Sequence, residues 1–298
     1  MADPFMIECD GLGKRYGQAE VLRGLHLQVP KGSIFGFLGR NGAGKTTTIK
    51  VLLGMARPTN GRARVFDLPV EEPAASVEIR RRTGFVSEDK DLYDFMTVTE
   101  IIDFTAGFYP RWRKDLQEKY VRSFELPLHS RVKTLSRGTR TKLALLLAFC
   151  RGAELLVLDE PTSGLDPVVA DEVLQLLVGH VARAETTVFL SSHQLAEVDQ
   201  IADRLAIIHR GYTVLTGALD DLRENFRRIQ LVFDGAAPEV TFRAPGVLRV
   251  KRQGRVLMVT ASGHAEAICA EARALGAASI DVGAIPLKEM FLEIVAED

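Results

Sequence analysis

The chain has 298 residues, of which 46% are hydrophobic and 26% are charged, a balance typical of a folded globular protein that excludes disordered and collagen-like classes. Its 38 basic and 39 acidic residues leave a net charge of −1, so no overall field favours nucleic acid or an anionic membrane surface. The three cysteines, Cys9, Cys150 and Cys269, lie far apart without metal-ligand spacing. They argue against a disulfide framework and a zinc site, and they favour a reducing compartment.

The sequence predicts no membrane span. Its first residues, Met1-Ala-Asp-Pro-Phe, lack the basic start and the apolar stretch of a secretory signal. The longest purely apolar run, residues 143–150, is much shorter than the roughly 20 residues that a spanning helix needs. We therefore expect a cytoplasmic protein whose role at a membrane, if it has one, depends on a partner.

The first two hundred residues alternate short apolar segments with longer helical patterns. This alternation predicts an α/β domain with a largely parallel sheet that is covered on both faces. The expected strands are residues 34–38, 155–159, 187–191 and 205–209. Between the first two lies a helix-rich stretch, residues 89–151, in which Thr97 and Glu100 have the spacing of a capping box.

The pattern changes after residue 219. Strands are expected at residues 229–233, 247–250 and 256–260, followed by helices at 265–275 and 287–295. We accordingly predict one large domain over residues 1–218, with a helical subdomain at about 89–151, and a small α+β accessory domain over residues 219–298.

The clearest motif is a phosphate-binding loop at residues 39–46. The segment reads Gly39-Arg-Asn-Gly-Ala-Gly-Lys-Thr46 and matches GxxxxGK[ST] between an apolar strand and a helical pattern. Its amides and helix N-terminus suit phosphates, Lys45 adds a positive charge, and the Thr46 hydroxyl suits Mg²⁺. A glycine-rich turn without a ligand is the plain alternative. The motif predicts binding of a nucleotide's phosphates with Mg²⁺, and the predicted nucleotide-binding residues here are Gly39, Asn41, Gly42, Ala43, Gly44, Lys45, Thr46 and Thr47.

Two adjacent acids end the expected strand at residues 155–159. Strand pleating sends Asp159 and Glu160 to opposite sides, so the two carboxylates can serve different purposes. Asp159 is expected to hold the Mg²⁺ shell, and Glu160 is expected to polarise the attacking water as a general base. The alternative is that both acids only cap the helix that follows.

With these motifs the sequence resembles the nucleotide-binding domain of ABC transporters over roughly residues 5–218. Residues 135–139, Leu-Ser-Arg-Gly-Thr, look like the LSGGQ signature, residues 163–166 resemble the D-loop, and His193 stands where the family has its switch histidine. The order and spacing of the motifs match the family. The resemblance implies a P-loop NTPase domain of ABC type, with a helical subdomain, that hydrolyses ATP. It also implies a dimer in which each ATP lies between one subunit's phosphate loop and the other's signature.

The resemblance also assigns roles to single residues. Ser136 and the amide of Gly138 would close on the γ-phosphate from across the dimer, while His193 would contact that phosphate and hold the attacking water. Tyr16 stands where the family places the aromatic ring that stacks on adenine. The expected catalytic residues are Glu160, His193 and Lys45.

The sequence departs from the family pattern in two places. Glu88 replaces the Q-loop glutamine, and its carboxylate suits Mg²⁺ or an ordered water. Arg137 and Thr139 replace a glycine and the glutamine of the signature, which we interpret as a character of the subfamily. The expected magnesium ligands are Thr46, Glu88 and Asp159.

The resemblance further implies a membrane partner. The family docks a helix of the membrane subunit near residues 88–99, which here carry Leu92, Tyr93, Phe95 and Met96; the alternative is that these side chains bury against the sheet. Residues 286–293 and 108–112 resemble ATPase subunits of bacterial exporters whose membrane half is a separate chain. We therefore expect a homodimer or heterodimer on the inner face of the cell membrane, held there by a separate permease and driving export.

Two alternatives come from other classes. One is a soluble ABC-type ATPase that acts on nucleic acid or ribosomes, although the chain has one phosphate loop, no sustained heptads and a nearly neutral charge. The other is a regulatory ATP switch in which the C-terminal domain senses a ligand.

Overall fold

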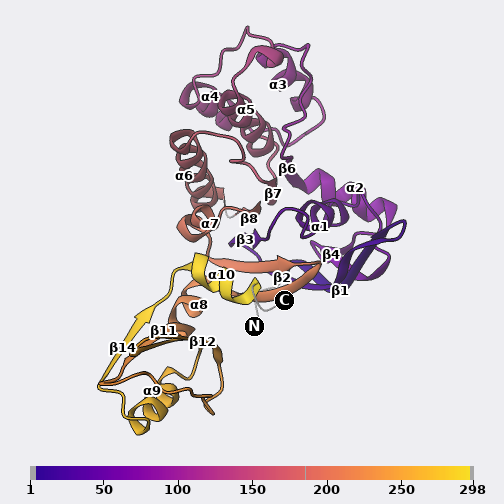
Figure 1. Ribbon diagram of the computed structural model, residues 1–298. Coiled ribbons are helices and arrows are strands. Elements are labelled where there is room, and N and C mark those ends of the chain that lie inside the picture. Colours follow the sequence, from indigo (N-terminus) through magenta and orange to yellow (C-terminus); the bar gives the residue numbers. More distant parts are fainter. Residues whose placement is uncertain (1–4, 185, 296–298) are drawn as a thin grey trace. The chain divides into compact units, whose positions relative to one another are not determined.

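The structure of the protein is a computed structural model, which describes residues 5–184 and 186–295 (Figure 1). The chain divides into two compact units, Met1–Thr216 and Gly217–Asp298. Within the described ranges, no helix has the length and apolar character needed to cross a membrane.

The first unit is built on a six-stranded sheet with the strand order β10-β9-β3-β8-β7-β6. The neighbours from β9 through β3, β8 and β7 to β6 pair in parallel. All residues of β3, β7 and β8 are buried, as expected for continuous apolar strands covered on both faces. The predicted parallel sheet is therefore confirmed. Its strands are β3 (Ile34–Leu38), β6 (Thr83–Val86), β7 (Leu155–Asp159), β8 (Thr187–Ser192), β9 (Arg204–His209) and β10 (Tyr212–Ala218).

A second sheet in this unit is antiparallel, and the strand pattern of the sequence does not predict it. It has the order β2-β1-β4-β5, with strands β1 (Phe5–Tyr16), β2 (Ala19–Pro30), β4 (Asn60–Val65) and β5 (Leu68–Pro69). Its apolar face joins the core that also contains Phe35 and Phe37 of β3 and Phe189 of β8. The phosphate loop thus follows a strand that is anchored in the main core of the unit.

Seven α-helices complete the described part of the first unit. Figure 1 shows α3, α4 and α5 gathered together within the predicted helical stretch. The apolar run at residues 143–150 is buried and ends α5, which packs against β6. The helices are α1 (Lys45–Leu52), α2 (Pro73–Arg82), α3 (Val98–Ala106), α4 (Lys114–Ser123), α5 (Arg137–Phe149), α6 (Pro167–Ala184) and α7 (Leu195–Ile201), with a 3₁₀ turn at Val132–Thr134 before α5.

The second unit is a four-stranded antiparallel sheet with the order β12-β13-β11-β14. Ile229, Leu257 and Val259 from the sheet share a core with Ile268 and Cys269 of α9. Ion pairs join the sheet to α10, and one of them links Arg249 to Glu293 at 3.0 Å. The elements are α8 (Leu219–Asn225), β11 (Phe226–Val232), β12 (Val247–Gln253), β13 (Val256–Ser262), α9 (Ala265–Ala274), β14 (Ser279–Ala284) and α10 (Leu287–Val295). The sequence pattern predicts all of them except α8 and β14.

The predicted capping box at the start of α3 is confirmed. Thr97 Oγ1 accepts a hydrogen bond from the Glu100 amide at 3.2 Å, and Glu100 Oε2 accepts one from the Thr97 amide at 2.7 Å. The same bonds lower the pKa of the Glu100 carboxyl below its ordinary value. Side chains therefore satisfy the Thr97 and Glu100 amides, while backbone carbonyls accept from the Val98 and Thr99 amides between them.

We predict that Thr97→Ala lowers the free energy of unfolding of the first unit by about 1 kcal/mol, because the helix loses its cap. Urea unfolding followed by circular dichroism would measure this change. Ser130→Ala is a nearby control. The Ser130 side chain makes no hydrogen bond to another described residue, and the variant keeps the Ser130 carbonyl, which accepts from the Val98 amide. Equal midpoints for Thr97→Ala and the unchanged chain would contradict the role of the cap.

Candidate functional site

The phosphate loop connects the end of β3 to the start of α1. Gly42 and Gly44 adopt φ angles of 81° and 114°, which only glycine adopts without strain, and Gly44 is the N-cap of the helix. The Lys45 side chain is buried and donates a hydrogen bond to the Gly39 carbonyl at 2.8 Å. The loop is thus a folded cradle with its amides and a buried lysine ammonium at the N-terminus of a helix, an arrangement suited to phosphate groups.

The Glu160 carboxylate is the centre of the site. Its Oε1 lies 3.0 Å from Lys45 Nζ, and its Oε2 lies 2.7 Å from His193 Nδ1 and accepts a 3.3 Å hydrogen bond from the His193 amide. Glu160 is 4% exposed and has a φ of 47°, a left-handed conformation that is uncommon for a residue other than glycine. The turn after β7 therefore holds this carboxylate between the phosphate loop and the end of β8.

One oxygen of Glu160 retains unused hydrogen-bonding capacity. Oε1 is buried and accepts no hydrogen bond from the described residues, although Lys45 is close enough for an ion pair. Buried carboxylate oxygens normally accept a hydrogen bond, so one without such a bond, in a residue that lines a hollow, suits a bound water or ligand. The general-base role expected of Glu160 would use this oxygen.

Asp159 precedes Glu160 and is held from another side. Its Oδ1 accepts a 2.5 Å hydrogen bond from Ser191 Oγ, which in turn lies 3.2 Å from the Glu160 amide. Among the described residues no three His, Cys, Asp or Glu side chains are grouped to hold a metal by themselves. Oxygen ligands from Thr46 and Asp159 fit Mg²⁺, which keeps waters and takes phosphate oxygens to complete its shell.

A hollow of about 250 Å³ gathers most of the predicted residues. Glu88 and Glu160 line it opposite the phosphate loop and α1, which contribute Asn41, Gly42, Gly44, Lys45, Thr46 and Thr47. Val21 of β2 also lines it. The predicted residues from three separate sequence segments thus lie around one cavity, with two carboxylates and a lysine.

The other predicted residues lie outside this hollow. Tyr16 is 47% exposed, and Lys14 Nζ lies 4.8 Å from the centroid of its ring. Gly39 and Ala43 are buried at the back of the phosphate loop. Ser136 caps α5 by accepting a 3.1 Å hydrogen bond from the Thr139 amide and is itself exposed. Gly138 packs against Val169 of α6, where a Cβ would come within 2.9 Å of Val169 Cγ1. The two signature residues therefore lie at an exposed helix start.

Lys90 is a site residue that the sequence analysis missed. It is 6% exposed, and its Nζ donates to the Glu160 carbonyl at 3.2 Å. Burial lowers the pKa of its ammonium group, with Arg137 adding to the effect, although the nearby acids oppose them. The only signal in the sequence is the charged run at residues 88–91, in which nothing distinguishes the buried lysine from its exposed neighbours.

Comparisons with known proteins establish the family of this chain. Residues 22–163 match the model of the family described as ABC transporter. A bacitracin transport ATP-binding protein, BcrA of Enterococcus faecalis, is 34% identical over 75% of this chain and 73% of its own. This chain belongs to the ABC transporter ATP-binding family. Its expected ABC-type α/β fold and its activity as a transport-coupled ATPase are thereby confirmed.

The resemblance to an ABC ATPase extends beyond the first unit. The daunorubicin resistance ATP-binding protein DrrA3 of Streptomyces coeruleorubidus is 32% identical to the present chain, and the match covers 100% of the present chain and 98% of DrrA3. A solved ATP-binding subunit of an ABC transporter superposes with a TM-score of 0.66 at 28% identity, covering 74% of this chain and 92% of its own. The second unit is thus also present in at least one relative of the family.

We predict that Ser191→Ala raises the Mg²⁺ concentration needed for half-maximal ATPase rate by about 10- to 100-fold, the usual effect of removing a group that orients a metal-binding carboxylate. A titration of the ATPase rate with Mg²⁺ measures this shift. Ser192→Ala is the matched control, because its hydroxyl bonds Glu197 at 3.0 Å instead of Asp159. Equal shifts in both variants would show that Ser191 has no special relation to the metal.

Proposed function

We propose that this chain is the ATPase subunit of a bacterial exporter, which dimerises around two ATP molecules and drives a separate membrane permease. The observation that supports it best is the separation of two half-sites on one chain. The phosphate loop, Glu88 and Glu160 line one hollow, whereas Ser136 and Gly138 lie at an exposed helix start outside it. A second subunit, either a copy of this chain or a related one, would bring its signature to the open side of the hollow.

The proposed chemistry uses the residues around Glu160. When bound, MgATP supplies the phosphoryl group and the charge that Lys45, Thr46 and Asp159 hold in place. Glu160 Oε1 takes the proton of the attacking water, while His193 fixes Oε2 through the 2.7 Å contact. Glu88 is positioned in the lining of the hollow to hold a water or Mg²⁺. We propose Tyr16 as the adenine contact from its place in the family pattern.

The domain boundaries form part of the same proposal. Residues 1–218 are the nucleotide-binding domain, with residues 89–151 as its helical subdomain, and residues 219–298 are an accessory domain. The compactness of the two units on either side of Gly217 supports this division.

The direction of transport is inferred from the relatives. BcrA is named for bacitracin transport and DrrA3 for daunorubicin resistance. Resistance to a compound is compatible with its outward movement. We therefore propose export, with this chain at the cytoplasmic face of the membrane and held there by its permease.

An exposed group of rings on the helical subdomain supports a docking role. Tyr93, Phe95, Phe104 and Phe108, here called the aromatic patch, are 51%, 67%, 43% and 64% exposed. Their rings form a contiguous row, with centroids 5.8 Å apart from Tyr93 to Phe95, 5.6 Å from Tyr93 to Phe104 and 5.0 Å from Phe104 to Phe108. The alternative that Tyr93 and Phe95 bury against the sheet is wrong, and clustered exposed aromatic rings indicate a binding surface.

We predict that Glu160→Gln abolishes turnover but keeps ATP binding, so that an ATP-bound dimer accumulates. Size-exclusion chromatography with light scattering would detect the dimer in ATP and its absence in ADP. Adding Ser136→Ala should remove the dimer but keep ATP binding by the monomer, because only the contact across the interface is lost. A turnover near that of the unchanged chain would remove Glu160 from its proposed role.

We also predict that the Glu160→Gln chain, solubilised with ATP from its native membrane fraction, co-purifies with a multi-helix membrane protein in fixed stoichiometry. Mass spectrometry of the purified complex would identify that protein. The same purification with Lys45→Ala is the control for dependence on nucleotide. A soluble dimer without a membrane protein would contradict the transporter proposal and would favour a regulatory switch.

A further inference from the structure

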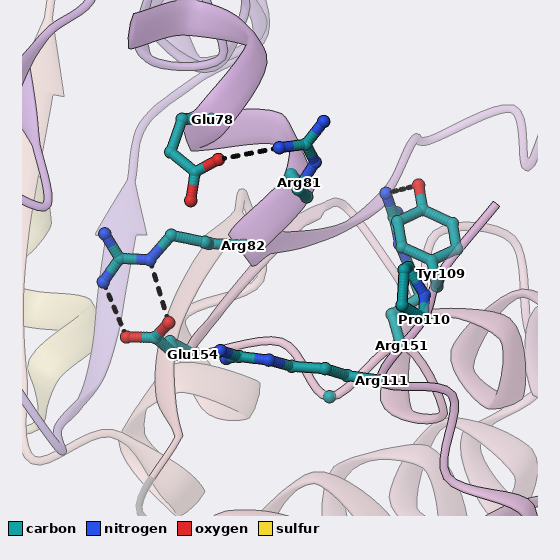
Figure 2. Close-up of a pocket in the computed structure, with 9 residues that line it drawn as sticks. Glu78, Arg81, Arg82, Tyr109, Pro110, Arg111, Arg151 and Glu154 are labelled. Carbon is teal, nitrogen blue, oxygen red and sulfur yellow. Dashed lines mark hydrogen bonds and ion pairs between the residues drawn. The ribbon is translucent and has the colours of Figure 1, made fainter.

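A pocket distinct from the ATP hollow lies between the end of α2 and the loops at residues 109–111 and 151–154. Its volume is about 390 Å³, a size suited to side chains or a small ligand. The charged groups that line it are Arg81, Arg82, Arg111, Arg151, Glu78 and Glu154 (Figure 2). The pocket is therefore rich in guanidinium groups.

Two of these arginines already have a carboxylate partner. Arg82 donates from Nε and Nη2 to the two oxygens of Glu154 at 2.8 and 2.7 Å, and Arg81 lies 3.2 Å from Glu78. Among the described residues, neither Arg111 nor Arg151 has an ion pair with a carboxylate. Arg82, and to a smaller extent Arg111, lower the pKa of the Glu154 carboxyl, so Arg111 partly shares that carboxylate. Within the described ranges, Arg151 is the guanidinium group of the pocket that no carboxylate offsets.

Arg151 is the more enclosed of the two. Its guanidinium lies 4.0 Å from the centroid of the Tyr109 ring, and its Nη2 donates to the Tyr109 hydroxyl (Figure 2). The same Nη2 also donates to the Arg80 carbonyl at 3.4 Å. Its Nε is buried without a hydrogen-bond partner among the described residues. Burial lowers the pKa of Arg151 to about 10, so the group remains charged at neutral pH. A partly buried cation without a counter-ion is unfavourable, and an incoming anion would offset that cost.

The pocket adjoins the aromatic patch. Arg151 also lines a second hollow together with Leu92 and Thr105, which directly flank Tyr93 and Phe104 in the chain. On the other side, Tyr109 of the pocket follows Phe108 of the patch. One continuous stretch of surface therefore offers apolar rings and a cationic pocket.

We propose that the pocket receives an acidic side chain from the docking segment of the membrane subunit, whose carboxylate binds Arg111, Arg151 and the Tyr109 hydroxyl. This inference rests on the proposed function and adds the chemistry of the partner. The same segment places apolar side chains on the aromatic patch. A free small anion would fill the pocket but would leave the adjoining rings uncovered, so the observations favour a peptide that carries both groups.

The test compares capture of the membrane protein by variants of the full chain, all in the Glu160→Gln background with ATP. Arg111→Glu should lower the captured amount by roughly tenfold or more, because it opposes the carboxylate with a like charge. Arg151→Gln should lower it as well. Arg62→Glu is the matched control, since Arg62 is exposed on β4 and outside the pocket, and it should leave capture unchanged. In the chain with Glu160 intact, Arg111→Glu should keep the basal ATPase rate.

A reciprocal exchange completes the test. Replacing an acidic residue of the captured protein's docking segment by arginine should restore capture by the Arg111→Glu chain. Full capture by both Arg111→Glu and Arg151→Gln would overturn this proposal while the transporter function stands, whereas no capture by any variant would reject the function itself. Failure of every acidic-to-arginine exchange to restore capture would also overturn it. Citrate serves as the small-anion probe, with thermal stability measured in saturating ADP. If citrate stabilised the unchanged chain but not Arg111→Glu, and capture by Arg111→Glu were unchanged, the pocket would be assigned to a small anion instead.

Discussion

The structure of the site depends on the burial of one carboxylate. Glu160 is almost fully enclosed, and a buried charge is strongly unfavourable unless it is paired and hydrogen-bonded. Lys45 and His193 pair with the two carboxylate oxygens of Glu160, and the Ser191 carbonyl accepts a hydrogen bond from its amide at 3.2 Å. These three partners come from different elements. The phosphate loop, the turn after β7 and the end of β8 therefore converge on this one residue. The contacts that hold the candidate active site together also compensate the burial of its carboxylate.

The same pairing relates nucleotide binding to catalysis. Lys45 now lies 3.0 Å from Glu160 Oε1, and the phosphates of a nucleotide would compete for its ammonium group. If Lys45 turned to those phosphates, the Glu160 carboxylate would still line the hollow, but without that cation beside it. His193 keeps the other oxygen in place and so preserves the orientation of the carboxylate.

Sequence patterns predicted the parts of the structure that depend on local chemistry. Continuous apolar runs identified β3 and β7 to the residue, and glycines at fixed spacing identified the phosphate loop. The long strands β1 and β2 escaped detection because register shifts interrupt their pairing and their alternation of buried and exposed residues. Lys90 escaped for another reason, since its φ of 48° turns one side chain of a charged run inward. Such a turn depends on tertiary contacts with Glu160 and Arg140 rather than on composition.

Those tertiary contacts also connect the aromatic patch to the candidate catalytic acid. Arg140, in the first turns of α5, donates to Asp94 at 2.6 Å and to the Lys90 carbonyl at 3.2 Å, and the Lys90 ammonium donates to the Glu160 carbonyl. Asp94 lies between Tyr93 and Phe95 of the patch, and α5 begins with the signature. A partner bound to the rings would therefore touch a segment that is hydrogen-bonded to both the signature helix and the turn that carries Glu160. Most of these contacts involve a charged group, and such hydrogen bonds are strong. A shift of the patch would therefore alter strong bonds at the site. A transport-coupled ATPase requires a physical connection of this kind between its partner and its catalytic acid.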